Sequence, residues 1–161
     1  MKNSLRRLRV LGTAAVIAVI AVIATVALAQ ELPRPSAEQA IKYRQSVYKV
    51  ILWNFGPMSA AAQDKADYDA KAFEHQAARV ATMAPMLIEG YPHGSHTGAT
   101  TRAKGEIWQN YAEFKQLMTA MVDKASALAE VAKEGNEDKS KAAFRELAAA
   151  CRACHDKYRN D

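Results

Sequence analysis

Cysteine is nearly absent from this sequence, and glycine and proline are scarce. Its 161 residues include two cysteines, seven glycines and five prolines. Two cysteines cannot form the several disulfide bonds that hold many small exported domains together. The sequence also lacks the strict alternation of apolar and polar residues that is typical of strands, which argues against a sheet-based fold. What remains is a set of long alanine-rich segments, of a total length that suits one domain.

The N-terminal segment contains no acidic residue, and it ends in a long uncharged run. Four Lys and Arg residues precede residues 10–29, which carry no charge. The run closes on Ala27-Leu28-Ala29, an A-x-A pattern that a signal peptidase can cleave to leave Gln30 first. We therefore predict a signal peptide over 1–29, export to the periplasm and a domain over 30–161. An uncleaved membrane anchor is the alternative, because the run approaches the roughly 20 residues of a bilayer span.

The excess of positive charge belongs mainly to this leader. The net charge of +5 falls to +1 when the leader's four basic residues are removed. A domain that is nearly neutral, with no basic stripe, gives no argument for nucleic-acid binding.

Four helices are predicted between the few glycine and proline residues. Ser36 and Gln39 can form a capping box at the start of the first helix, and Pro57 is expected to end or kink it. Pro85 is a predicted kink in the second helix, and Gly135 is suited to terminate the third. The predicted helices span residues 36–55, 67–89, 104–134 and 136–159.

In each helix, apolar residues recur at alternating spacings of three and four, which defines a core-facing stripe. Such stripes are typical of helices that cross at about 20° in a bundle. With short connections, the sequence predicts an all-α, antiparallel up-down-up-down four-helix bundle. The stripes comprise Ile41, Arg44, Tyr48, Ile51, Phe55 and Met58; Phe73, Ala77, Val80, Ala84 and Leu87; Ile107, Tyr111, Phe114, Met118, Met121, Ala125 and Leu128; and Phe144, Leu147, Cys151, Cys154 and Tyr158.

Both cysteines lie in one motif, CRACHDKYR at 151–159, which allows three interpretations. A thioredoxin-like redox pair is expected at a helix N-terminus in a βαβ setting, whereas this motif lies near a helix C-terminus. A structural zinc site needs a fourth ligand, which His93 or His96 would have to supply. The third interpretation is C-x-x-C-H haem attachment. In that case Cys151 and Cys154 bond covalently to the haem, and His155 ligates the iron. The sequence favours haem c, one per chain.

Arg44 gives an independent indication, because an arginine on a core-facing stripe is costly unless it meets an anion. A haem propionate is such an anion, and a guanidinium can bind it through two hydrogen bonds. The alternative is that Arg44 extends to the surface at the end of the bundle.

The sequence resembles the cytochrome c′ family over nearly the whole segment after the leader. The resemblance rests on the motif at 151–159 and on KYRQS at 42–46, FGPM at 55–58, YDA at 68–70, EIW at 106–108 and FK at 114–115. It implies covalent Cys151 and Cys154, axial His155, and propionate contacts from Arg44 and Gln45.

Further contacts are implied by the same resemblance. It places Arg159, one helical turn after the histidine, beside the proximal face of the haem. The family often adds a polar contact from the loop between the second and third helices, for which Ser95 and Thr97 are candidates. The family also commonly forms a homodimer through its first two helices.

Tyr48 bears on the iron's second axial position. Low-spin relatives of this fold carry a methionine at this place, but a neutral phenol is a poor ligand for ferric iron. The resemblance therefore implies a five-coordinate, high-spin iron that binds nitric oxide or carbon monoxide. The Tyr48 hydroxyl supplies one hydrogen-bond donor, which is compatible with weak dioxygen binding as well. The alternative is a six-coordinate, low-spin cytochrome for periplasmic electron transport, with an unknown redox partner. No distal His–Arg acid/base pair is visible, so we expect no enzymatic activity.

Overall fold

The computed structural model describes residues 34–160, and the predicted leader lies outside the described residues. Within them the chain is helical, and no strand occurs. None of the described helices is both long and apolar enough to cross a membrane. The elements are α2 (Ala37–Ala62), α3 (Ala70–Met83), the 3₁₀ helix η1 (Ala84–Gly90), α4 (Glu106–Gln109), α5 (Tyr111–Ala132) and α6 (Glu137–Tyr158).

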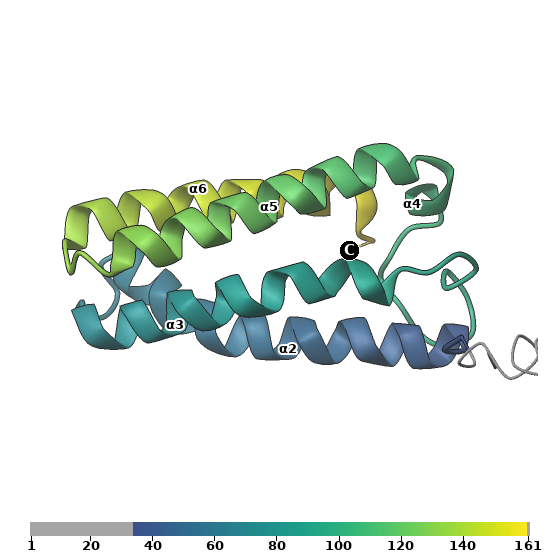
Figure 1. The fold of residues 1–161 in the computed structure, drawn as a ribbon, viewed down its shortest axis with the longest axis horizontal. Helices are drawn as coiled ribbons and strands as arrows, with labels where there is room; N and C mark the ends of the chain where they lie inside the picture. The colour runs from purple at the N-terminus through teal and green to yellow at the C-terminus, as the bar shows by residue number, and fades with distance from the viewer. Residues whose placement is uncertain (1–33, 161) are drawn as a thin grey trace, which may run out of the picture. The chain divides into compact units, whose positions relative to one another are not determined.

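The long helices form two antiparallel pairs. In Figure 1, α2 and α3 with η1 lie in one layer, and α5 and α6 lie in the other. Successive helices run in opposite directions, so the predicted up-down-up-down four-helix bundle is confirmed. Phe73, Phe114, Leu128 and Leu147 are among the side chains that fill the space between the layers.

The first helix begins as predicted but continues further. Ser36 accepts a hydrogen bond from the Gln39 amide at 3.2 Å, while the Gln39 side chain accepts one from the Ser36 amide at 2.8 Å. The helix then passes through Pro57 and ends at Ala62, so the predicted end near Phe55 was wrong. Pro57 is exposed, so water can bond the carbonyl that loses its helical partner, while the next residue, Met58, stays fully buried.

The second predicted helix changes type at Pro85. Asp69 caps α3 by accepting a hydrogen bond from the Ala72 amide at 2.9 Å, so the helix begins at Ala70 rather than near 67. After Met83 the chain tightens into η1, which carries Pro85 in its first turn. The predicted kink is thus realised as a switch from α to 3₁₀ geometry.

The third predicted helix is divided in two. Asn110 leaves helical geometry, with φ −120° and ψ 40°, between α4 and α5. Gly135 follows α5 with a φ of +66°, a conformation that favours glycine. Asn136 then caps α6 by accepting a hydrogen bond from the Lys139 amide at 3.0 Å, at the position where the sequence predicts that this helix begins.

The segment before α4 is tied to the end of α6 by backbone hydrogen bonds. Ala103 and Arg159 form an isolated antiparallel bridge. The Lys104 amide donates to the Tyr158 carbonyl at 3.0 Å, and the Asn160 amide donates to the Arg102 carbonyl at 2.8 Å. These bonds hold the connection between η1 and α4 beside the cysteine-bearing helix.

Candidate functional site

One end of the bundle brings together most of the predicted site residues. The C-terminal end of α6, the N-terminal half of α2, α4 and the connection between η1 and α4 all lie there (Figure 1). The cysteine motif is therefore surrounded by the elements that carry Arg44, Tyr48 and the loop residues.

The two cysteines lie one turn apart on α6 and are not bonded to each other. Both are free thiols; Cys154 is 9% exposed and Cys151 is partly buried. Burial, reinforced by the neighbouring Cys151, raises the pKa of Cys154 to about 11, and burial also raises the pKa of Cys151. Both groups are therefore protonated at neutral pH, unlike the low-pKa thiol of a thioredoxin-like pair.

His155 follows Cys154 and lies beside Arg159. Arg159 Nη1 is 3.3 Å from His155 Nδ1, which leaves Nε2 as the ring nitrogen available to a metal. Burial and then the positive charge of Arg159 lower the pKa of His155, so the imidazole is neutral, the form that ligates iron. These residues line a hollow of about 320 Å³ together with Lys104, Asp156 and Asn160.

Arg44 is buried and hydrogen-bonded almost completely. Its Nη1 donates to the Gly90 carbonyl at 2.8 Å and to Ser95 Oγ at 3.1 Å. Its Nη2 donates to the Ser95 carbonyl at 2.9 Å and to Thr101 Oγ1 at 3.0 Å. Among the described residues the Nε–H has no hydrogen-bond partner, so that donor is the one left for a propionate. A guanidinium presents five donors in all.

The guanidinium also stacks on aromatic rings. It lies 4.6 Å from the ring centroid of Tyr91 and 5.7 Å from that of Trp108. At Gly90 a side chain would collide with Arg44, because a Cβ there would lie 2.5 Å from Arg44 Cβ. The close approach of η1 to α2 therefore requires glycine at this position.

The other residues that were predicted to contact the haem propionates differ from one another in burial and in hydrogen bonding. Gln45 is exposed, and its amide donates to the Thr100 carbonyl at 2.9 Å. Ser95 is fully buried and donates to the Pro92 carbonyl at 2.9 Å while accepting from Arg44. Thr97 is exposed. The loop thus brings Ser95 to Arg44 and leaves Thr97 at the surface.

Tyr48 faces a second tyrosine that the sequence analysis did not identify. The hydroxyl oxygens of Tyr48 and Tyr91 are 3.3 Å apart. Burial is the main cause that raises the pKa of each, and the pKa of Tyr48 is raised well above its ordinary value. A negative charge on Cys154 would raise the pKa values of both tyrosines further. The two phenols therefore lie near the cysteine motif. Tyr91 could have been suspected as an aromatic residue within a loop rich in glycine.

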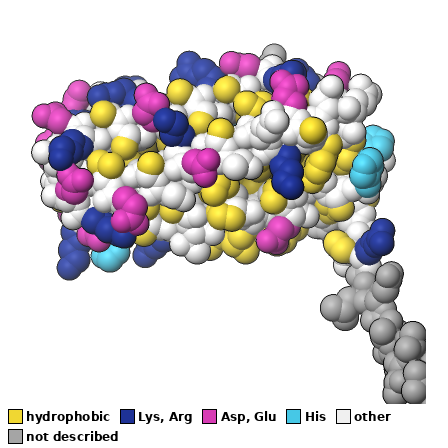
Figure 2. Space-filling model, turned by 45° about the horizontal axis from the view of Figure 1, so that its top comes forward, with side chains coloured by type: hydrophobic (Ala, Val, Ile, Leu, Met, Phe, Trp, Pro, Cys, Tyr) yellow, Lys and Arg dark blue, Asp and Glu magenta, His cyan; other side chains and the backbone are white. Residues whose placement is uncertain are grey.

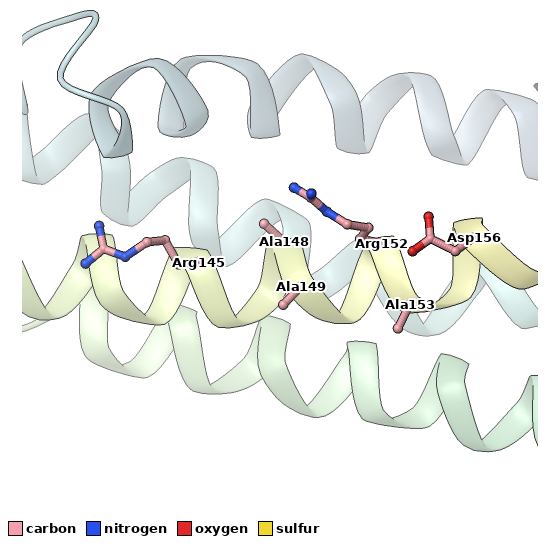
Figure 3. A pocket seen from close by; sticks show the side chains of 6 residues that line it. All are labelled: Arg145, Ala148, Ala149, Arg152, Ala153 and Asp156. Atoms are coloured by element: carbon pink, nitrogen blue, oxygen red, sulfur yellow. The ribbon is translucent and has the colours of Figure 1, made fainter.

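A second hollow lies on the outer face of α6. Figure 3 shows its lining: Arg145 and Arg152 flank a floor of small side chains, with Asp156 at one end. It measures about 540 Å³ and opens to solvent. Neither cysteine lines it, so this hollow is not the site of the motif.

The residues present fit a covalently attached haem. Two free thiols one turn apart and a neutral imidazole form the donor set that C-x-x-C-H attachment needs. At the same end of the bundle, the ring of Tyr91 packs against Trp108 and Phe114 at centroid distances of 6.1 and 4.8 Å. Across residues 34–160, no group of three His, Cys, Asp or Glu side chains is placed to hold a bare metal ion.

Comparison with known proteins gives consistent matches. Residues 39–159 match the family model described as Cytochrome C′. A cytochrome c′ of Rubrivivax gelatinosus is 37% identical over 123 residues, which cover 74% of this chain and 93% of that protein. The structure of cytochrome c prime from Shewanella frigidimarina superposes with a TM-score of 0.75 at 39% identity, covering 78% of this chain and 98% of the other.

Another similar structure contains a gas ligand. It is the nitric oxide complex of a mutant of cytochrome c prime from Alcaligenes xylosoxidans, with a TM-score of 0.72 and 34% identity. The match covers 78% of this chain and 97% of that one.

Proposed function

This chain belongs to the cytochrome c′ family and carries a covalently bound haem c, and on that basis we propose that it is a periplasmic protein that binds nitric oxide and carbon monoxide. In this proposal Cys151 and Cys154 hold the haem through thioether bonds, and His155 is the axial ligand. Bound haem supplies an iron that can take a diatomic ligand at its second axial position.

The presence of a tyrosine, rather than a methionine, at position 48 is the observation that carries the proposal. Burial raises its pKa well above the ordinary value, so the side chain is a phenol rather than the phenolate that ligates iron. The next methionine on the same stripe, Met58, is fully buried nearly three turns further along α2. The iron is therefore proposed to be five-coordinate and high-spin.

Hydrogen-bond donors at the same end of the bundle suit the haem's carboxylates. Arg44 retains its Nε–H, and Gln45 is exposed with an amide that now bonds a loop carbonyl. We assign propionate contacts to these two residues, with Ser95 and Thr97 of the loop between η1 and α4 as further candidates. Arg159 is assigned to the proximal side, next to His155.

Electron transport is the second function that the geometry favours. Cys151 and His155 are only partly buried, so an edge of the attached haem would lie close to solvent, where outer-sphere transfer to a redox partner is possible. The same arrangement fits a low-spin electron carrier if another side chain reaches the iron.

Optical and electron paramagnetic resonance spectra of the holoprotein distinguish the two functions. We expect a high-spin ferric spectrum, and ferrous spectra that change on adding nitric oxide or carbon monoxide. Tyr48→Met serves as the comparison, because a thioether at this position should give a low-spin, six-coordinate iron. A wild-type spectrum that is already low-spin and indifferent to either gas would show that electron transfer is the better assignment.

We extend the proposal to the whole chain. A signal peptide over 1–29 would direct the domain over 30–161 to the periplasm. A homodimer would use α2, which exposes Val50, Leu52 and Trp53 to 43%, 63% and 82%. Large exposed apolar side chains on one helix are a usual mark of an interface.

A further inference from the structure

The loop between η1 and α4 carries two histidines that neither haem attachment nor gas binding uses. His93 and His96 enclose Gly94 and Ser95 in the sequence His-Gly-Ser-His, and both histidine side chains are exposed. Imidazole nitrogens are ligands that late first-row divalent ions such as Zn²⁺ and Cu²⁺ prefer. Two imidazoles on one short loop therefore make it a candidate site for such an ion.

The loop forms a tight turn that is anchored on its inner side. The Ser95 amide and hydroxyl both donate to the Pro92 carbonyl, at 3.2 and 2.9 Å. Ser95 is fully buried, and its hydroxyl also accepts a hydrogen bond from Arg44. Gly94 has a φ of +82°, a left-handed conformation that glycine adopts without strain. The backbone between the histidines is thus fixed before any ligand arrives, which reduces the entropy that binding would cost.

Both imidazoles lie against one short segment of the bundle, where α4 meets α5. The His96 ring is 5.5 Å from the Trp108 ring, and the His93 ring is 6.5 Å from the Tyr111 ring, measured between centroids. The Trp108 indole also donates to the Pro92 carbonyl at 2.9 Å, which holds this segment against the turn. The two imidazoles are therefore on the same side of the turn. Because both are exposed, rotation about their side-chain bonds can bring their nitrogens to one ion.

Protein ligands would fill only part of the ion's coordination shell. Within residues 34–160, no group of three His, Cys, Asp or Glu side chains gathers at one place. Water would complete the coordination, as it does in zinc sites that keep an open position. Two ligands on a fixed backbone bind one ion together more tightly than either binds alone, so loss of one imidazole should remove most of the affinity.

We propose that His93 and His96 form a binding site for one divalent transition-metal ion, Zn²⁺ or Cu²⁺, with water at the remaining positions. The site is separate from the haem and does not use its iron. Ser95 connects it to Arg44 through the hydrogen bond described above. A bound ion would therefore fasten the loop that supplies acceptors to Arg44.

Titration of the holoprotein with Zn²⁺, followed by isothermal calorimetry, tests the site. The protein is prepared without a histidine tag, and in the holoprotein His155 is assigned to the iron. We expect one Zn²⁺ per chain. His93→Gln and His96→Gln should each weaken binding about tenfold or more, because either change leaves a single imidazole. His75→Gln is the matched control: His75 is an exposed histidine of α3, and its loss should leave the affinity unchanged.

Cu²⁺ provides a readout of the ligands themselves. Nitrogen hyperfine splitting in the electron paramagnetic resonance spectrum of the Cu²⁺-loaded holoprotein should show two imidazole nitrogens in wild type and one in either single variant. Gly94→Ala keeps both imidazoles but strains the turn, since alanine adopts a φ of +82° at a cost. We expect this variant to bind Zn²⁺ about threefold more weakly than wild type.

The outcomes that overturn the site differ from those that overturn gas binding. The site is refuted by a wild-type holoprotein that takes up no Zn²⁺, by undiminished binding in the two single variants, or by an equal loss in His75→Gln. A holoprotein that binds Zn²⁺ but neither nitric oxide nor carbon monoxide would retain the metal site and contradict the proposed function. Gas binding without Zn²⁺ binding would do the reverse.

Discussion

Arg44 has the largest of the fully buried side chains between residues 34 and 160, and no carboxylate in that range pairs with it. Neutral oxygens of Gly90, Ser95 and Thr101 accept its hydrogen bonds instead. A buried charge usually needs a counterion, so the residue suits the anionic edge of a cofactor. At the same time it fastens the loop after η1 to α2.

Replacement of Arg44 by methionine should destabilise the holoprotein by about 3 kcal/mol, because several buried acceptors lose their donor. Urea denaturation followed by circular dichroism measures the change. Lys42→Met is the control: Lys42 is exposed on the same helix and pairs only with Glu38, so its loss should cost less than about 0.5 kcal/mol. Equal effects of the two substitutions would mean that the buried hydrogen bonds contribute little.

The phenol pair makes stability depend on alkaline pH. Tyr48 and Tyr91 have pKa values raised above 10.0 in the folded protein, whereas in the unfolded chain they ionise near that value. The unfolded state therefore loses protons first, and the free energy of unfolding should fall as the pH rises through and beyond 10. Denaturation on either side of pH 10 measures the slope, which should be shallower in Tyr48→Phe. An unchanged slope in that variant would contradict the raised pKa.

At the scale of elements, the helical stripes were predictable and the interruptions were less so. Phe73, Val80 and Leu147 are buried where the periodicity places them. Pro57 was expected to interrupt α2, but an exposed proline removes one hydrogen bond that water can replace, and packing on the opposite face maintains the helix. The break between α4 and α5 was not predicted, because position 110 is an asparagine and neither proline nor glycine marks it.

Two glycines in or beside helices should respond oppositely to alanine. Gly90→Ala should destabilise the protein by about 2 kcal/mol, since the new Cβ would lie 2.5 Å from Arg44 Cβ and 3.1 Å from its Cα. Gly105→Ala should stabilise it by about 0.4–1 kcal/mol, because Gly105 already has the helical dihedrals φ −63° and ψ −24° and its Cβ would meet nothing within 4 Å. Thermal unfolding of both variants provides the comparison. A neutral Gly90→Ala would show that η1 can move away from α2 at little cost.

At the scale of the whole described domain, the face shown in Figure 2 mixes charges of both signs. Figure 2 shows Lys and Arg interspersed with Asp and Glu, with apolar side chains between them. This agrees with the near-neutral charge expected once the leader is removed, and partner choice therefore has to depend on local patches rather than on net charge.

The exposed apolar face of α2 is the patch that we expect to hold a second copy of the chain. Trp53→Glu should shift the protein from dimer to monomer in sedimentation experiments, because it places a charge at the centre of a buried interface. Ala142→Glu, on the exposed face of α6, is the control and should leave the dimer intact. A wild-type protein that sediments as a monomer would refute the dimer.

The candidate site shows what a sequence can and cannot predict. The cysteines and His155 were predictable because their chemistry depends on spacing along one helix. Arg44 was recognised as unusual, but its acceptors lie 46 to 57 residues away, and only the folded loop shows which atoms they are. Tyr91 escaped notice because its position opposite Tyr48 depends on how η1 packs on α2.

The backbone bridge between residues 102–104 and 158–160 also bears on the order in which the molecule folds. Arg102 bonds the carbonyl of Asn160 across 58 positions of the chain, and closing so long a loop has an entropic cost that helix formation does not have. The bridge should therefore form late, after α5 and α6 have paired. Its amides should exchange with solvent earlier than those in the middle of α6, so the end of the bundle that carries the cysteine motif would open locally before the domain unfolds.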